Sequence, residues 1–301
     1  MSAATDARVS GFAFVDDPLD RADLLRGDAE ALRRLWPQAR VLCLDAEGRA
    51  RADAQGQPMP RTGAQAGAGP EGAIFLGLDG EQAWFAQAGD AADAETPGVD
   101  LRQAGATWPA REAGVFALAR ALLHWQSRTR FCGVCGGGVR FERAGYLGRC
   151  TQCHAEHYPR VDPAVIAAVS DGRRLLLGRK AEWPARRYSL IAGFVEPGET
   201  LEQTVAREVM EETGVRVRRS RYLASQPWPF PGALMLGFEA LAEPDPPRLE
   251  DELEDVRWFE REQVGAALER GGEDAPLRLP PRLSIARALV ERWYRHGPMP
   301  A

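Results

Sequence analysis

The sequence predicts an α+β protein in three parts, in which a short cysteine-rich segment separates two larger domains. Short apolar runs alternate with turn residues from Gly11 to about Gly89. The composition then changes abruptly to Cys and Gly near residue 129, and patterns typical of strands and helices return from Asp162 onward. We therefore expect an N-terminal α+β domain at 1–128, a small cysteine module at 129–160 and a second domain with helices and strands at 161–301.

Strands and a short helix are expected in the N-terminal domain. The apolar runs Phe12–Val15 and Val41–Leu44 predict strands, and Asp28–Trp36 predicts a helix. Residues 52–72 are rich in Ala, Gly, Gln and Pro and have no periodicity, which predicts a mobile loop. The glycines of this loop spell G-x-G-x-x-G, but no strand precedes them, so the match does not indicate a dinucleotide site.

A long amphipathic helix is expected between Pro109 and about Arg128. Apolar residues recur there at spacings of three and four, namely Val115, Leu118, Leu122 and Trp125. After the cysteine segment, Val165–Val169 and Arg174–Leu177 predict a hairpin that turns at Asp171–Gly172.

The charge balance excludes a general nucleic-acid coat. Lys and Arg number 38 against 43 Asp and Glu, and a net charge of -5 cannot displace counterions along a phosphate chain. Recognition of a single nucleotide or a nucleic-acid end stays open. No stretch approaches the ~18 apolar residues of a membrane span. We expect no signal peptide and no membrane partner. The odd total of five cysteines, four of them in CxxC pairs, favours a reducing compartment, so we expect a cytoplasmic protein.

Two Cys-x-x-Cys pairs predict a structural zinc site. Fourteen residues separate CGVC from CTQC, and the four thiolates can surround one tetrahedral ion without leaving a vacancy for substrate. The alternatives are two redox pairs or two local disulfides. We interpret His154 and His157 as surface or packing residues and Cys43 as a small buried apolar residue. The expected zinc ligands are Cys132, Cys135, Cys150 and Cys153.

An acidic helix is the second motif that carries chemistry. Thr200 and Gln203 can form a capping box at its start, and Gly214 can end it. Glu208, Glu211 and Glu212 stand at i, i+3 and i+4, so three carboxylates crowd one face and repel each other. A Mg²⁺ or Mn²⁺ ion would relieve this repulsion. The alternative is a solvated acidic face.

The same segment matches the Nudix box at Gly193, Glu199, Arg207, Glu208, Val209, Glu211, Glu212, Gly214 and Val215. Downstream, Ser225–Pro231 reads SQPWPFP and resembles the signature of the NADH pyrophosphatase branch of the Nudix hydrolase family, the branch that includes NAD-cap RNA hydrolases. The cysteine module resembles the zinc ribbon of that branch. The resemblance covers about Gly89 to Tyr294.

This resemblance implies a Nudix α/β/α sandwich on a mixed sheet, preceded by a zinc ribbon. It implies metal-dependent hydrolysis of the diphosphate bond of NAD(H) to NMN(H) and AMP, with the NAD cap of an RNA 5′ end as a further substrate. It also implies a homodimer. Two alternatives stay open: hydrolysis of ADP-ribose or another nucleoside diphosphate derivative, and a non-catalytic nucleotide sensor. The complete set of box carboxylates disfavours the sensor.

The resemblance also implies roles for individual residues. Glu212 is expected to act as the base or a metal-bridging residue, and Glu208 as the principal Mg²⁺ or Mn²⁺ ligand. Glu211 and Arg207 are the other expected catalytic residues. The Ala192 carbonyl and Glu252 would complete the metal site; for Glu252 a solvated acidic loop is the alternative. The expected substrate contacts are Gln226, Pro227, Trp228, Pro229, Phe230, Pro231, Gly232, Ala233, Ala286, Tyr158 and Arg102.

Two of these positions have a physical interpretation of their own. Alternate prolines should hold Trp228 and Phe230 in an extended backbone, where both rings can stack on a base for about 1–3 kcal/mol each. A proline-rich linker is the alternative. Ala233 stands where the family usually has Ser, which removes a hydroxyl from the expected substrate contacts. Tyr158 could equally be a packing aromatic beside the zinc ribbon.

Overall fold

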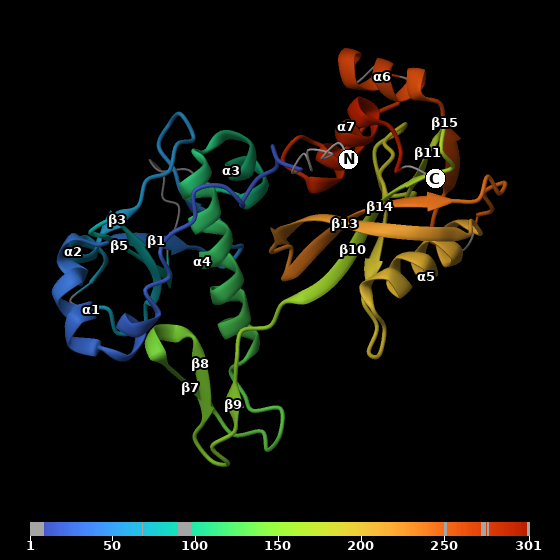
Figure 1. Cartoon of the computed structure of the whole chain (residues 1–301). Coiled ribbons are helices and arrows are strands. Elements are labelled where there is room, and N and C mark those ends of the chain that lie inside the picture. Colours follow the sequence, from blue (N-terminus) through green and yellow to red (C-terminus); the bar gives the residue numbers. More distant parts are fainter. Residues whose placement is uncertain are drawn as a thin grey trace, which may run out of the picture. The chain divides into compact units, whose positions relative to one another are not determined.

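The computed structural model describes residues 9–67, 69–89, 98–249, 252–271, 275 and 277–299. The chain forms two compact units (Figure 1). The N-terminal unit comprises Ala13–Val161 together with Pro227–Gly232. The second unit comprises Met1–Phe12, Asp162–Gln226 and Ala233–Ala301. Within the described ranges, no helix is both long and apolar enough to cross a membrane.

A mixed sheet forms the centre of the N-terminal unit. Its strand order is β4-β5-β1-β2-β6, with β3 paired to β1, and β1 runs parallel to β5. The strands are β1 (Arg40–Leu44), β2 (Ala50–Arg51), β3 (Arg61–Thr62), β4 (Ile74–Asp79), β5 (Gln82–Ala88) and β6 (Gly98–Val99). The helices are η1 (Asp23–Gly27), α1 (Ala29–Leu35), η2 (Trp36–Gln38), α2 (Gly63–Ala66), α3 (Leu101–Thr107) and α4 (Ala110–Arg128).

Side-chain alternation along β1 places helices on both faces of this sheet. Leu42 and Leu44 belong to the core that α4 covers, whereas Val41 and Cys43 pack with Leu32 of α1 on the other face. The predictions of the strand at 41–44, of both helices and of a buried Cys43 are confirmed. Each rested on an apolar period that matches its element.

Two predictions in this unit are wrong. The run Phe12–Val15 forms a turn instead of a strand, with Phe14 in the left-handed region at φ 73°. Residues 52–72 carry β3 and α2, and the Thr62 hydroxyl and the Gln65 side chain form a capping box. Trp36 donates from its indole N–H to the carbonyl of Gly67 at 3.0 Å. Residues 61–66 therefore form regular structure although the segment has no periodicity of its own.

A three-stranded antiparallel sheet of the same unit carries Cys150 in one strand, and Cys132, Cys135 and Cys153 lie in the turns outside its strands. Its order is β7-β8-β9, with β7 (Val139–Glu142), β8 (Leu147–Cys150) and β9 (Glu156–His157). The short helix η3 (Arg143–Gly145) joins β7 to β8.

The second unit is an α/β/α sandwich on a mixed sheet, as the resemblance implies. Its strand order is β13-β14-β10-β11-β15, with β12 paired to β10, and β10 runs parallel to β14. The strands are β10 (Asp162–Ser170), β11 (Leu175–Arg179), β12 (Ile191–Phe194), β13 (Val217–Trp228), β14 (Ala233–Ala242) and β15 (Asp255–Phe259). Strands β10 and β11 pair antiparallel from Ser170 opposite Leu175, which confirms the predicted hairpin.

Helices cover both faces of this sheet. Helix α5 (Leu201–Thr213) buries Val205 and Val209 against the face that carries Phe238 of β14. Helix α7 (Ile285–His296) lies on the opposite face, where Gly237 makes room: a Cβ there would be 2.9 Å from Ile285 Cδ1. Helix α6 (Arg261–Arg270) packs on α7.

Candidate active site and metal sites

The four expected zinc ligands converge. The Cys132 and Cys153 sulfurs are 3.6 Å apart and those of Cys135 and Cys150 are 3.4 Å apart, and all four lie within 4.8 Å of one another. A tetrahedron of Zn–S bonds of about 2.3 Å places its sulfurs about 3.8 Å apart. The spacing fits one zinc ion, and all five cysteines of the chain are free of disulfides.

Backbone turns aim the thiols at one point. The Cys132 amide donates to the Gly137 carbonyl at 2.7 Å, and Gly136 takes a φ of 76° that suits glycine. The amide of Gln152 donates to the Cys150 sulfur at 3.4 Å. The backbone N–H groups of Gln152 and Cys153 lower the pKa of Cys150 to about 6, which favours the thiolate that a metal binds.

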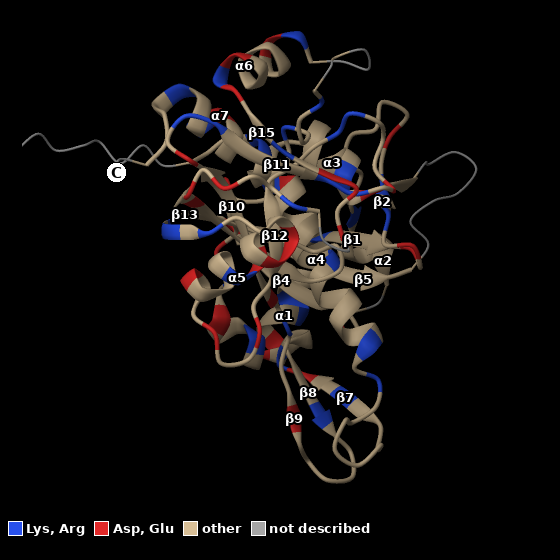
Figure 2. Cartoon of the chain, turned by 90° about the vertical axis from the view of Figure 1, so that its right-hand side faces the viewer, with Lys and Arg blue, Asp and Glu red and all other residues tan. Residues whose placement is uncertain are grey.

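Arg207 organises the acidic face of α5. Its guanidinium donates to Glu199 at 2.6 Å and 3.1 Å, to Glu208 at 3.0 Å and to Glu211 at 2.8 Å. It also donates to the Phe194 carbonyl at 2.9 Å. One cation thus offsets repulsion among three carboxylates, and its hydrogen bonds with Glu199 come first in lowering the pKa of that residue to about 2. Acidic segments of α5 appear in Figure 2.

The helix itself forms as the sequence predicts. The Thr200 hydroxyl and the Gln203 side chain form the capping box, and Gly214 ends the helix in the left-handed conformation at φ 67°. These two ends fix the register, so Glu208 and Glu212 fall one turn apart on the same side.

Gly193 of β12 leaves space for the Glu208 carboxyl group. A Cβ at this position would lie 1.8 Å from Glu208 Cδ and about 2 Å from both of its oxygens (1.9 and 2.1 Å). The strand also carries Ala192, which pairs with Ile166 of β10. A carboxylate and the Ala192 residue expected to bind a metal therefore come from adjacent elements.

Glu212 is a buried carboxyl group at 7% exposure. Its pKa is raised to about 7, mainly by burial; the charge of Lys180 opposes this rise, and the charges of Glu208 and Glu252 add to it. No side-chain or backbone donor to Glu212 exists among the residues that the structure describes. Ionising a largely buried carboxyl group is unfavourable, and a cation beside it would offset this cost.

Lys180, which the sequence did not single out, lies at the same face. Its ammonium group donates to Glu252 at 3.0 Å, and Glu252 is otherwise exposed. Among the described residues, the four cysteines are the only cluster of three or more metal-ligating side chains that could hold one ion as they stand. The carboxylates of Glu208, Glu212 and Glu252 do not form such a cluster in this structure.

The aromatic loop does not present two free rings. Strand β13 ends at Trp228, a turn follows, and both Trp228 and Phe230 pack against the core of the N-terminal unit. Their ring centroids are 4.8 Å apart. The expected extended backbone through Phe230 is therefore wrong: the chain turns there, and Pro227 and Pro231 are its exposed residues.

Gln226 and Ala286 come together through a buried amide. The Gln226 side chain donates to the Leu283 carbonyl at 2.8 Å and accepts from the Ile285 amide at 2.8 Å. Gln226 is fully buried, and Ala286, next to Ile285, is 2% exposed. In this structure both residues shape the start of α7, and Gln226 holds it.

The remaining expected contacts are accessible to different degrees. Tyr158 is 58% exposed and donates to Glu156, so it is not a core aromatic. Gly232 and Ala233 are half-buried at the start of β14. The Arg102 guanidinium lies over Phe230 at 4.2 Å and over Trp228 at 5.3 Å.

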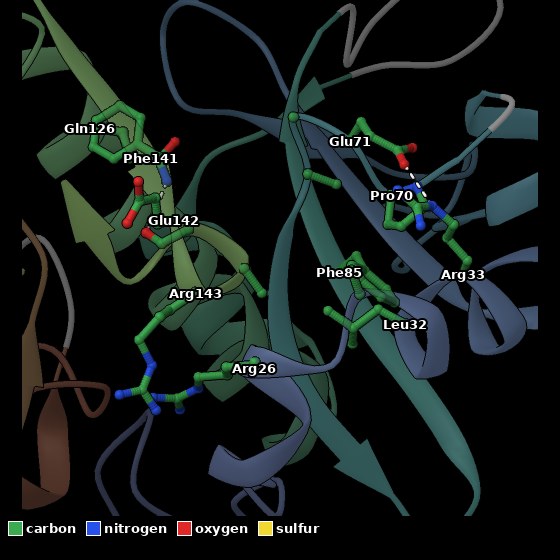
Figure 3. Close-up of a pocket in the computed structure, with 16 residues that line it drawn as sticks. Arg26, Leu32, Arg33, Pro70, Glu71, Phe85, Gln126, Phe141, Glu142 and Arg143 are labelled. Atoms are coloured by element: carbon green, nitrogen blue, oxygen red, sulfur yellow. Dashed lines mark hydrogen bonds and ion pairs between the residues drawn. The ribbon is translucent and has the colours of Figure 1, made fainter. Parts of the chain in front are cut away.

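A separate cavity of about 580 Å³ opens in the N-terminal unit (Figure 3). Arg26, Arg33 and Arg143 reach it around apolar residues such as Leu32 and Phe85. Arg33 is paired with Glu71 at 2.8 Å, and both Arg26 and Arg143 are paired with Asp23. None of the residues expected at the active site lines this cavity.

Comparison with known proteins identifies the family. Residues 160–279 match the NUDIX domain, and residues 25–125 match the NADH pyrophosphatase-like rudimentary NUDIX domain. The protein named NAD-capped RNA hydrolase NudC of Mycobacterium bovis is 41% identical over 288 residues, which cover 91% of this chain and 92% of that protein. This chain belongs to the Nudix family.

Other relatives of this Nudix protein match parts of it. Human NAD-capped RNA hydrolase NUDT12 is 44% identical over 199 residues, 62% of this chain and 43% of that protein. The crystal structure of a NUDIX hydrolase from Nitrosomonas europaea is 28% identical, covers 57% of this chain and 96% of its own, and has a TM-score of 0.45.

Proposed function

We propose that this Nudix protein hydrolyses the diphosphate bond of NAD(H), releasing NMN(H) and AMP, and that it also removes NAD caps from RNA 5′ ends. The observation that carries the proposal is the complete acidic face of α5, with Glu208 over Gly193 and a buried Glu212 that lacks a donor. The relatives named NAD-capped RNA hydrolase support this choice of substrate.

Glu212 is proposed as the base. Its carboxylate can take a proton from the attacking water. The water oxygen bonds to one phosphorus, the anhydride P–O bond breaks, and the leaving phosphate oxygen receives a proton from solvent. Arg207 keeps Glu208 and Glu211 fixed during this step.

The carboxylates of this face fit Mg²⁺ or Mn²⁺, because both ions prefer oxygen ligands. Glu208, Glu212, Glu252 and the Ala192 carbonyl would hold the ion. When bound, it supplies neutralisation of the diphosphate charge and lowers the pKa of water.

A structural zinc at the four cysteines, a cytoplasmic location and a homodimer belong to the same proposal. The close sulfur spacing supports the zinc ion. Light scattering in solution tests the dimer by its mass. ADP-ribose is the second candidate substrate, because the same acidic face would act on any nucleoside diphosphate derivative.

The test is a comparison of kcat/KM for NADH, NAD⁺, ADP-ribose and NAD-capped RNA, with Mg²⁺ or Mn²⁺ and product analysis by chromatography. We expect AMP and NMN(H) from NADH. Glu208→Gln should lower kcat by at least about 100-fold. Glu202→Gln is the matched control, since Glu202 is exposed on the first turn of the same helix. A preference for ADP-ribose over NADH would refute the assigned substrate.

A further inference from the structure

Arg120 of α4 contacts the loop Pro227–Gly232, which carries the two rings expected to bind the substrate base. Its guanidinium donates to the Pro229 carbonyl and lies 5.2 Å from the Phe230 ring centroid. The loop and α4 belong to the same compact unit. The sequence gives no sign of this contact, because 109 residues separate the partners.

The surroundings of Arg120 indicate that this contact is its main interaction. The side chain is partly buried, and no carboxylate pairs with Arg120 or Arg102 among the described residues. Burial lowers the pKa of Arg120, and the positive charge of Arg102 lowers it further, while the charge of Asp100 opposes both. A hydrogen bond from a charged donor to a carbonyl is strong, so the contact with Pro229 can hold the loop.

The two rings of the loop, Trp228 and Phe230, differ in their contacts with these arginines. Arg102 and Arg120 both lie over Phe230, at 4.2 and 5.2 Å, whereas only Arg102 lies near Trp228. A ring engaged by two guanidinium groups has less of its surface open to a base. Phe230 is therefore the anchor of the loop, and Trp228 is the ring left for stacking.

We propose that Arg120 is a positioning residue for substrate binding: through Pro229 and Phe230 it holds the loop so that Trp228 is placed for the base. The inference rests on the proposed function for its substrate, and the contacts that carry it do not depend on that substrate.

The first experiment measures kinetics with NADH. Arg120→Met should raise KM by about 10-fold or more and change kcat by less than about 2-fold, because the loop binds ground and transition states alike. Arg120→Lys should reverse at least half of the change in log KM, since the lysine ammonium group can donate to the Pro229 carbonyl. Arg128→Met is the matched control, because Arg128 is exposed at the end of the same helix.

A double-mutant cycle tests the route through Phe230. If Arg120 acts through that ring, Arg120→Met with Phe230→Leu should raise KM by clearly less than the product of the two single effects. A double variant whose rise in KM equals the product of the two single effects would overturn the proposal. So would an unchanged KM in Arg120→Met, or an equal change in Arg128→Met.

Hydrogen exchange separates this inference from the proposed function. Amides of the peptide 228–238 should exchange faster in Arg120→Met than in the wild type or Arg128→Met, whatever the substrate is. A wild-type protein that cleaves no dinucleotide would refute the proposed function alone. Unchanged exchange in Arg120→Met would refute the positioning role, even if the wild-type protein hydrolyses NADH.

Discussion

Gly193→Ala should disable catalysis while leaving the fold intact. The added Cβ would lie 1.8 Å from Glu208 Cδ, and ordinary contact begins at 3.4 Å, so the carboxyl group must retreat by about 1.6 Å. Glu208 then loses its place beside Ala192 and its hydrogen bond with Arg207. A misplacement of about 1 Å can cost about 100-fold in rate, so we expect kcat to fall at least that much.

The assay has two parts. Steady-state NADH hydrolysis over a range of Mg²⁺ and Mn²⁺ concentrations should show both a lower kcat and a higher metal requirement. Thermal unfolding should change by only a few degrees, because Gly193 lies in β12 with normal backbone angles and the displaced group is a side chain.

Gly114→Ala provides the matched control. Gly114 lies inside α4, and a Cβ there would meet nothing closer than the Phe14 carbonyl at 3.9 Å. This variant should keep wild-type kinetics. A Gly193→Ala protein with a near-normal kcat would refute the argument that Glu208 acts from its position over Gly193.

Three further predictions concern Glu212, the cysteines and Glu199. Glu212→Gln should lower kcat at least about 100-fold, yet stabilise protein kept free of Mg²⁺ and Mn²⁺ by up to about 3 kcal/mol at high pH. Because burial raises the Glu212 pKa to about 7, the wild-type protein loses stability as pH rises from about 4.5 through 7. Urea unfolding at pH 5 and pH 8 measures the difference in stability between Glu212→Gln and the wild type, which should be larger at pH 8. Metal analysis should find about one zinc per chain, and Cys150→Ser should lose it together with thermal stability; a zinc-free wild type of equal stability would contradict the structural role. Arg207 holds the Glu199 pKa at about 2, so the stability that Glu199 contributes is complete above its unfolded pKa and is lost as pH falls toward 2. Glu199→Gln should therefore be destabilising at pH 6 and less so at pH 3 in thermal melts, and a pH-independent difference would argue against the ion pair.

The sequence by itself determines the local elements and the metal-ligand spacing. Helix α5 begins at a capping box and ends at a left-handed glycine, and both signals lie within a few residues of the backbone they satisfy. The residues that form the turns at the Cys-x-x-Cys pairs likewise lie within or next to the motifs themselves. The hairpin at 165–177 and helix α4 follow from periods that match their elements.

Only the tertiary structure decides which distant residues meet. The Gln226 amide holds the start of α7 about 60 residues away, the Glu208 carboxyl group fills the space over Gly193, and Arg120 reaches the loop at Pro229. The Trp36 indole likewise donates to the Gly67 carbonyl, 31 residues away. Periodicity reports which side of an element is buried, but not which partner buries it. That choice is made by packing and hydrogen bonding between segments far apart in the chain.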